Sequence, residues 1–179
     1  MTMDRKLKFY LTEKGFLKIR LSKGGKVKIT LEVKAKKLYE YLNTIIQPIE
    51  PDNGIVDNLC KLTDDNFGKT NDSKVIDFVS HVYLHKNVKW VGKSNDKEYS
   101  IAIDSIVYHS KSKDPNDVDF FHDTTIMGSG GANSIVEARV KEDLRLINKE
   151  DIYTMNCSVY KDGLHKKSFH IDPKLMGNA

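Results

Sequence analysis

The chain has 179 residues and a net charge of +4, and its hydrophobic fraction of 39% and charged fraction of 30% are typical of a folded globular protein. No apolar run is long enough for a membrane-spanning helix, and no apolar segment follows the first residues as a secretory signal requires, so we expect a cytoplasmic protein without membrane contacts. The two cysteines, Cys60 and Cys157, are too few for a disulfide framework or a four-cysteine zinc site. We therefore expect reduced thiols, no cofactor and no metal.

The first 33 residues alternate between apolar and polar side chains, which is the period of a β-strand. The alternation predicts strands at 7–11, 17–21 and 27–33. Gly24 and Gly25 separate the last two strands and suit a tight turn. We therefore predict a three-stranded antiparallel β-meander with one apolar face and one basic face.

The period changes to that of a helix after the third strand. Apolar residues then recur at helical spacing, at Leu38, Tyr41, Leu42 and Ile45. Pro48 ends this pattern, because proline cannot continue a helix interior. We expect this helix to cover the meander, with its apolar stripe against Ile19 and Ile29, and to complete a basic module over residues 1–50.

Residues 51–74 form the predicted connector, since they are rich in Asp, Asn, Thr and Gly. Four apolar residues at its start could form a short helix: Ile55, Val56, Leu59 and Leu62. The segment from 63 to 73 has few apolar residues, and we interpret it as a linker.

Residues 75–179 are strand-like almost throughout, with six or seven short strands separated by turn residues. This pattern predicts an antiparallel Ig-like β-sandwich, so the whole chain is expected to be mainly β. Trp90 should fill the space between the two sheets. The turn at 161–163 should pair the last strand, which carries Phe169 and Ile171, with the strand at 153–159.

Three runs in this half resemble a small bacterial Ig-like family, common in Bacteroidetes, whose members often carry the label "nucleotide synthetase". The runs are Asn87-Val88-Lys89-Trp90, the segment 99–104, and the closing Lys167-Ser168-Phe169-His170-Ile171-Asp172-Pro173-Lys174-Leu175. They are also similar, more distantly, to the PixA-type inclusion body proteins. The resemblance covers a little over half of the chain and implies an Ig-like fold, and its label implies nucleotide chemistry.

Charge is unevenly distributed along the chain. Residues 1–47 contain 12 basic and 4 acidic residues, a net charge of +8, and the remainder has a net charge of −4. Lys18, Lys26 and Lys28 alternate with apolar residues and are the candidate contacts for a phosphate-bearing ligand. No RNP-like aromatic motif, zinc finger or arginine cluster accompanies them, so we do not expect nucleic acid to be the main partner.

Few other residues suggest chemistry. His122 and Asp123 lie beside two phenylalanines and are candidate ligand-binding residues, although a polar loop is the simpler interpretation. His81 and His85 have metal-binding spacing only on a helix, and we expect a strand there. The glycines at 128–131 precede a strand, so we interpret them as an inter-strand loop. No residue qualifies as catalytic, since Cys157 lies on the apolar side of its strand.

These observations favour a non-enzymatic accessory protein that binds another protein or copies of itself, in a bacterial stress or defence system. One alternative is a nucleotide-binding sensor or enzyme that uses the basic N-terminal module. A second alternative is a nucleic-acid-binding protein.

Overall fold

The computed structural model of the chain describes residues 7–11, 17–21, 25–45, 51–66, 75–108 and 119–179, and of the first two segments only the backbone. Within this part, the protein is mainly β, as predicted, with twelve strands and two α-helices. Neither helix is long or apolar enough to cross a membrane.

The first two predicted strands are present as a hairpin. β1 (Leu7–Leu11) pairs antiparallel with β2 (Leu17–Leu21), and the register places Phe9 opposite Ile19. In the described part of the chain these two strands pair only with each other. The predicted three-stranded meander is therefore wrong in its third strand, which lies in a different sheet.

That strand, β3 (Val27–Val33), is an inner strand of a four-stranded sheet in the order β4-β3-β6-β9. It pairs antiparallel with β4 and parallel with β6, a strand about 60 residues further along the chain. Its odd-numbered residues are buried and its even-numbered residues face outward, as the alternation predicts. The other strands of this sheet are β4 (Cys60–Asp64), β6 (Asn87–Ser94) and β9 (Val136–Arg139).

The second sheet has six strands and is built around β10, the longest strand of the protein. Its path runs β5-β12-β10-β7-β8, and β11 pairs with the C-terminal half of β10. The β12–β5 pair is parallel, so this sheet too departs from the predicted all-antiparallel arrangement. Its strands are β5 (Val79–Tyr83), β7 (Tyr99–Tyr108), β8 (Thr125–Met127), β10 (Glu150–Lys161), β11 (His165–Ile171) and β12 (Lys174–Asn178).

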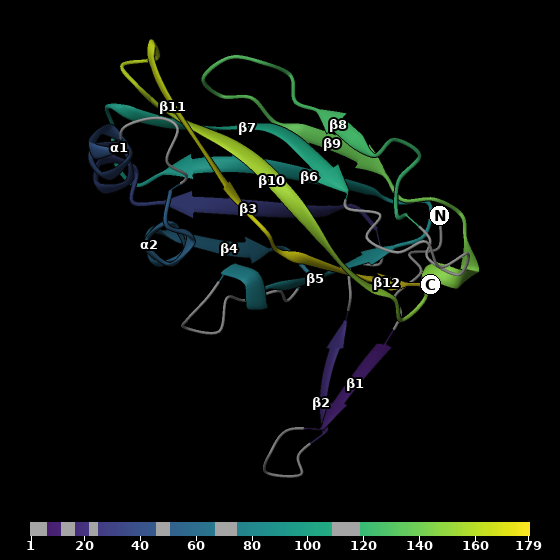
Figure 1. Cartoon of the computed structure of the whole chain (residues 1–179). Helices are drawn as coiled ribbons and strands as arrows, with labels where there is room; N and C mark the ends of the chain where they lie inside the picture. Colours follow the sequence, from purple (N-terminus) through teal and green to yellow (C-terminus); the bar gives the residue numbers. More distant parts are fainter. Residues whose placement is uncertain (1–6, 12–16, 22–24, 46–50, 67–74, 109–118) are drawn as a thin grey trace.

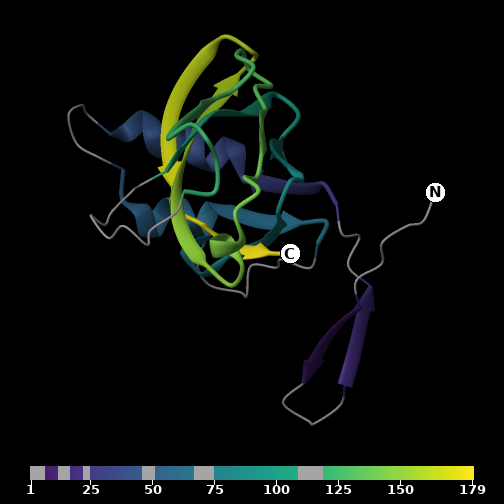
Figure 2. The same ribbon diagram turned by 90° about the vertical axis from the view of Figure 1, so that its right-hand side faces the viewer.

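The core lies between the two sheets. Figure 1 shows β10 crossing over β6 and β3, and Figure 2 shows the same layers from the side. Trp90 of β6 is fully buried and donates its indole N–H to the hydroxyl of Tyr153 on β10, at 2.9 Å. Its ring also meets Phe121 edge-on, at 5.7 Å between centroids. The prediction that Trp90 fills the space between the sheets is confirmed, and the Ig-like assignment stays a prediction.

The predicted first helix, α1 (Ala35–Thr44), is present, but it covers a different surface from the one expected. Leu38 and Leu42 are buried in the same core cluster as Ile29, and the main neighbours of the helix are β7, β10, β11 and α2 (Figure 1). The side chain of Ile19 lies outside the described residues. The helix packs here because it directly follows β3, which is an inner strand of the four-stranded sheet.

The predicted short helix in the connector is also present as α2 (Asn53–Leu59). Asp52 precedes it and accepts hydrogen bonds from the backbone N–H groups of Gly54 and Ile55. Such a cap satisfies N–H groups that have no partner within the helix.

The C-terminal hairpin forms as predicted. Asp162 and Gly163 take positive φ values of 51° and 70° at its turn, and Phe169 and Ile171 are buried. The pairing of β11 with β10 ends at Ile171, and pairing with the N-terminal part of β10 resumes after Pro173. The chain then continues into β12, which the sequence did not indicate. Gly177 is required in β12, because a side chain there would come within 1.8 Å of the Leu146 carbonyl oxygen.

Two short 3-10 helices complete the fold, η1 (Val75–Asp77) before β5 and η2 (Leu144–Leu146) before β10.

Candidate functional site

The candidate phosphate contacts predicted from the sequence lie on two different β-structures. Lys26 and Lys28 are exposed at the start of β3, and the backbone N–H of Lys28 donates to Asp65 at 2.9 Å. Lys18 lies in β2, where its register partner is Tyr10, and its side chain is outside the described part. The structure therefore brings Lys26 and Lys28 together and does not join Lys18 to them in one sheet.

His122 and Asp123 are both exposed in the loop that joins β7 to β8. This loop belongs to the six-stranded sheet, and the two lysines belong to the four-stranded one. No hydrogen bond or ion pair links the two sets in the described residues. A ligand-binding role for either set stays a prediction.

His81, His85 and the two cysteines lie at separate places in the fold. His81 lies on β5 with its Nδ1 at 3.2 Å from the side-chain amide of Asn178, whereas the Nε2 atom of His85 contacts the carboxylate of Glu142. Burial raises the pKa of the Cys157 thiol well above its ordinary value. Burial, with the carboxylate of Asp57, raises the pKa of Cys60 to about 12. Both thiols are thus poor nucleophiles at neutral pH, since the thiolate is the reactive form.

A basic surface emerges on the outer face of the four-stranded sheet, and it combines residues from both halves of the chain. Lys28 is the register partner of Lys89, and Lys89 that of Glu137. Further along, Glu32 lies between Lys61 and Lys93 and forms an ion pair with Lys93 at 2.9 Å. We call this surface the basic face; it carries five basic and two acidic residues: Lys28, Lys61, Lys89, Lys93, Arg139, Glu32 and Glu137.

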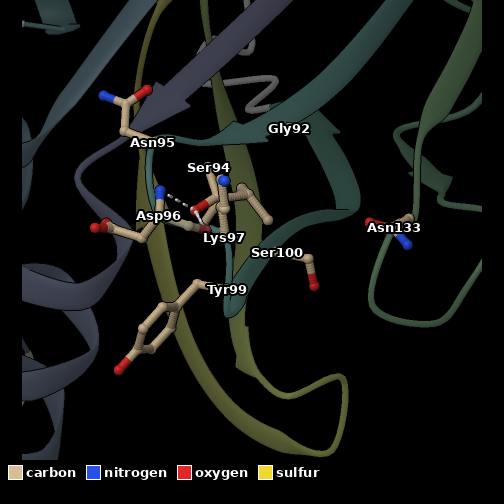
Figure 3. A pocket seen from close by; sticks show the side chains of 9 residues that line it. Gly92, Ser94, Asn95, Asp96, Lys97, Tyr99, Ser100 and Asn133 are labelled. Carbon is tan, nitrogen blue, oxygen red and sulfur yellow. Dashed lines mark hydrogen bonds between the residues drawn. The ribbon is translucent and has the colours of Figure 1, made fainter.

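A polar pocket of about 240 Å³ lies where β6 turns into β7 (Figure 3). The turn from Ser94 to Tyr99 forms one wall, and Asn133, from the loop before β9, lies opposite. Gly92 and Ile101 complete the lining. A side chain at Gly92 would come within 2.3 Å of the Ile101 carbonyl oxygen, so glycine lets the two strands approach and shapes the pocket.

Two of the lining residues already have structural partners. The hydroxyl of Ser94 accepts from the backbone N–H of Asp96 at 2.9 Å and donates to its carbonyl at 2.7 Å. The carboxylate of Asp96 accepts from the backbone N–H of Lys36, in the first turn of α1, at 2.9 Å. Lys34 provides no side-chain cap for α1, so Asp96 serves that purpose from another part of the chain.

This pocket could not be recognised from the sequence. The run from Ser94 to Lys97 has the composition of an ordinary turn, and Asn133 is more than 30 residues further along the chain. The only available signal was the polar turn between two apolar strands, which many surface loops share.

No protein-family model matches the chain, and no curated protein matches its sequence. Among solved structures, an inclusion body protein of the PixA type from Burkholderia cenocepacia is similar, with a TM-score of 0.57 and 8% identity. The match covers 86% of this chain and 96% of that one. The antigen BSR4 of Toxoplasma gondii matches with a TM-score of 0.29 and 9% identity, over 62% of this chain and 46% of that one.

The likeness to the PixA-type protein shows a shared fold. It agrees with the resemblance expected from the closing residues, and at 86% of the chain it extends beyond the C-terminal half to which that resemblance was confined. This wider extent fits the strand pairing, because β3 and β4 are part of the same sheet as β6 and β9.

Proposed function

We propose that the protein is non-enzymatic and associates with copies of itself, as an accessory protein in a bacterial stress or defence system. The observation that carries this proposal is the fold shared with an inclusion body protein over most of both chains. That protein is described as an inclusion body protein, and self-association of this chain would use the exposed edges of its own sheets.

One such edge lies at β8, which pairs with β7 alone in the described part of the chain. The backbone groups along an unpaired edge can form hydrogen bonds with a strand of another molecule. Met127 lies on this strand with 71% of its surface exposed, although methionine is usually buried. Association along β8 would cover both the open edge and this side chain.

Light scattering coupled to gel filtration tests the proposal directly. We expect a mass that is a multiple of 20.4 kDa and rises with protein concentration. The variant Met127→Lys should reduce it, because it places a charge at the edge of the sheet. Leu144→Lys is the matched control, since Leu144 is 75% exposed in η2, away from β8. A mass of 20.4 kDa at every concentration would contradict self-association, and equal losses in both variants would contradict the role of β8.

The basic face favours a second candidate function, the binding of a polyanion such as nucleic acid. Lys28 and Lys89 are cross-strand neighbours of like charge, which is unfavourable in a sheet, and Glu137 on the other side of Lys89 supplies one opposite charge for the two lysines. The uncharged outward-facing positions of this sheet, Thr30, Thr63, Asn87 and Val91, are not aromatic either, so any binding would be electrostatic and would lack base stacking.

Retention on heparin distinguishes this candidate. If the basic face binds polyanions, replacing Lys28 and Lys89 by Glu should remove about two phosphate contacts and lower the salt dependence of log K by about 2. Replacing Lys166 and Lys167 by Glu is the control, because these lysines lie on β11 in the other sheet. Equal effects of both double variants would show that net charge alone causes retention.

A further inference from the structure

The pocket between β6 and β7 is lined by three polar side chains without a hydrogen-bond or ion-pair partner in the described part of the chain. These are the side chains of Lys97, Ser100 and Asn133. They come from three different segments: the turn, the start of β7 and the loop before β9. Figure 3 shows them around the same hollow.

The chemistry of these groups indicates what they would bind. Lys97 supplies a full positive charge, and lysine acts as a point-charge donor to phosphate. Ser100 and Asn133 can each donate a hydrogen bond through a hydroxyl and an amide. Three donors from three segments of the chain suit a tetrahedral group with three or more acceptor oxygens better than a planar carboxylate with two.

Asp96 is the one acidic residue of the pocket, and its charge is partly compensated. Its carboxylate accepts the backbone N–H of Lys36 in the first turn of α1. The start of a helix carries a partial positive charge, which favours a carboxylate at that position. Asp96 therefore weakens an anion site at the pocket without excluding one.

The size of the pocket limits the ligand. Pockets for drug-sized molecules measure roughly 300 to 1,000 Å³. At about 240 Å³, this open pocket holds a single group rather than a whole nucleotide. We propose that it binds a phosphate group, either as inorganic phosphate or as a small phosphate monoester, through Lys97, Ser100 and Asn133. This site differs from the lysines at 18, 26 and 28 that the sequence suggested, and its occupation is independent of self-association.

An NMR titration of the ¹⁵N-labelled full chain, at constant ionic strength in chloride, tests this inference. Inorganic phosphate should shift the amide signals of residues 92–101 and the side-chain amide of Asn133 in a saturable manner. Glycerol 3-phosphate forms the second arm: tighter binding of the monoester would identify an ester ligand, and tighter binding of phosphate the free ion. Acetate should produce no saturable shift.

Three variants make the assignment specific. Lys97→Gln should weaken binding at least tenfold, whereas Lys86→Gln, at the other end of β6, should not change it. Asp96→Asn keeps an acceptor for the Lys36 N–H and removes a negative charge, so it should tighten binding severalfold. Unchanged binding in Lys97→Gln, shifts scattered over the whole surface, or equal binding of acetate would overturn the proposal.

Discussion

Replacing Leu42 by Asp should remove most of the stability of the protein. Leu42 is 6% exposed on the inner side of α1, next to the fully buried Leu38. The substitution would bury a charge that has no partner, which costs several kcal/mol, roughly, when the group is not paired. A domain of this size is stable by only about 5 to 15 kcal/mol. Urea denaturation followed by circular dichroism should show a midpoint close to zero denaturant.

Asn43→Asp is the matched control for this experiment. Asn43 is the next residue of the same helix and is exposed, so the variant adds the same charge at nearly the same distance from the helix C-terminus. The unfavourable interaction of that charge with the helix dipole, about 0.3 to 1 kcal/mol, is thus shared by both variants. Equal stabilities of the two variants would show that Leu42 is not buried in solution.

The faces of the strands could be predicted from the sequence because burial follows the period of two. In β10 the buried apolar residues Tyr153, Met155, Cys157 and Val159 are those that the alternation selects, and Ser158 on the other parity is buried as well. Trp90 was assigned to the core because its large apolar ring fills the space between two sheets, and it is fully buried.

The partners of the strands could not be predicted in the same way. Alternation tells which side of a strand is buried, but it does not tell which strand lies beside it. Gly24 and Gly25 suggested a tight hairpin between β2 and β3, yet β3 gains more by joining β4 and β6, where its odd residues become fully buried. A parallel pair such as β3–β6 needs a long connection, and the sequence gives no local signal for it.

β12 was missed because its sequence is weak for a strand. It holds a glycine, and of its five residues only Leu175 and Met176 are apolar. Its formation depends on backbone pairing with β5 on one side and β10 on the other. It also depends on the close approach of Gly177 to the Leu146 carbonyl. The pocket beside β7 could not be predicted for a related reason. Lys97 and Asn133 are far apart in the sequence, and only the fold makes them line the same pocket.

Deletion of Phe169 to Ala179 should have the largest effect on the protein, because it removes part of one strand and the whole of another. The buried side chains lost with this segment include Phe169, Ile171 and Leu175. Loss of a buried aromatic alone costs roughly 3 to 5 kcal/mol, and each large aliphatic residue roughly 2 to 5 kcal/mol. The sum exceeds the usual stability of a domain.

The position of β12 makes this loss greater than the side chains alone suggest. β12 lies between β5 and β10 and is the only strand that pairs with β5 in the described part of the chain. Its removal would therefore detach β5 from the sheet and expose the buried Phe78 and Val82 beside it. We expect insoluble protein, or soluble protein without a cooperative thermal transition by circular dichroism. Deletion of the exposed Ala179 alone, which lies outside β12, should leave the melting temperature unchanged. If the longer deletion also left solubility, spectrum and melting temperature unchanged, neither β11 nor β12 would contribute to the sandwich in solution.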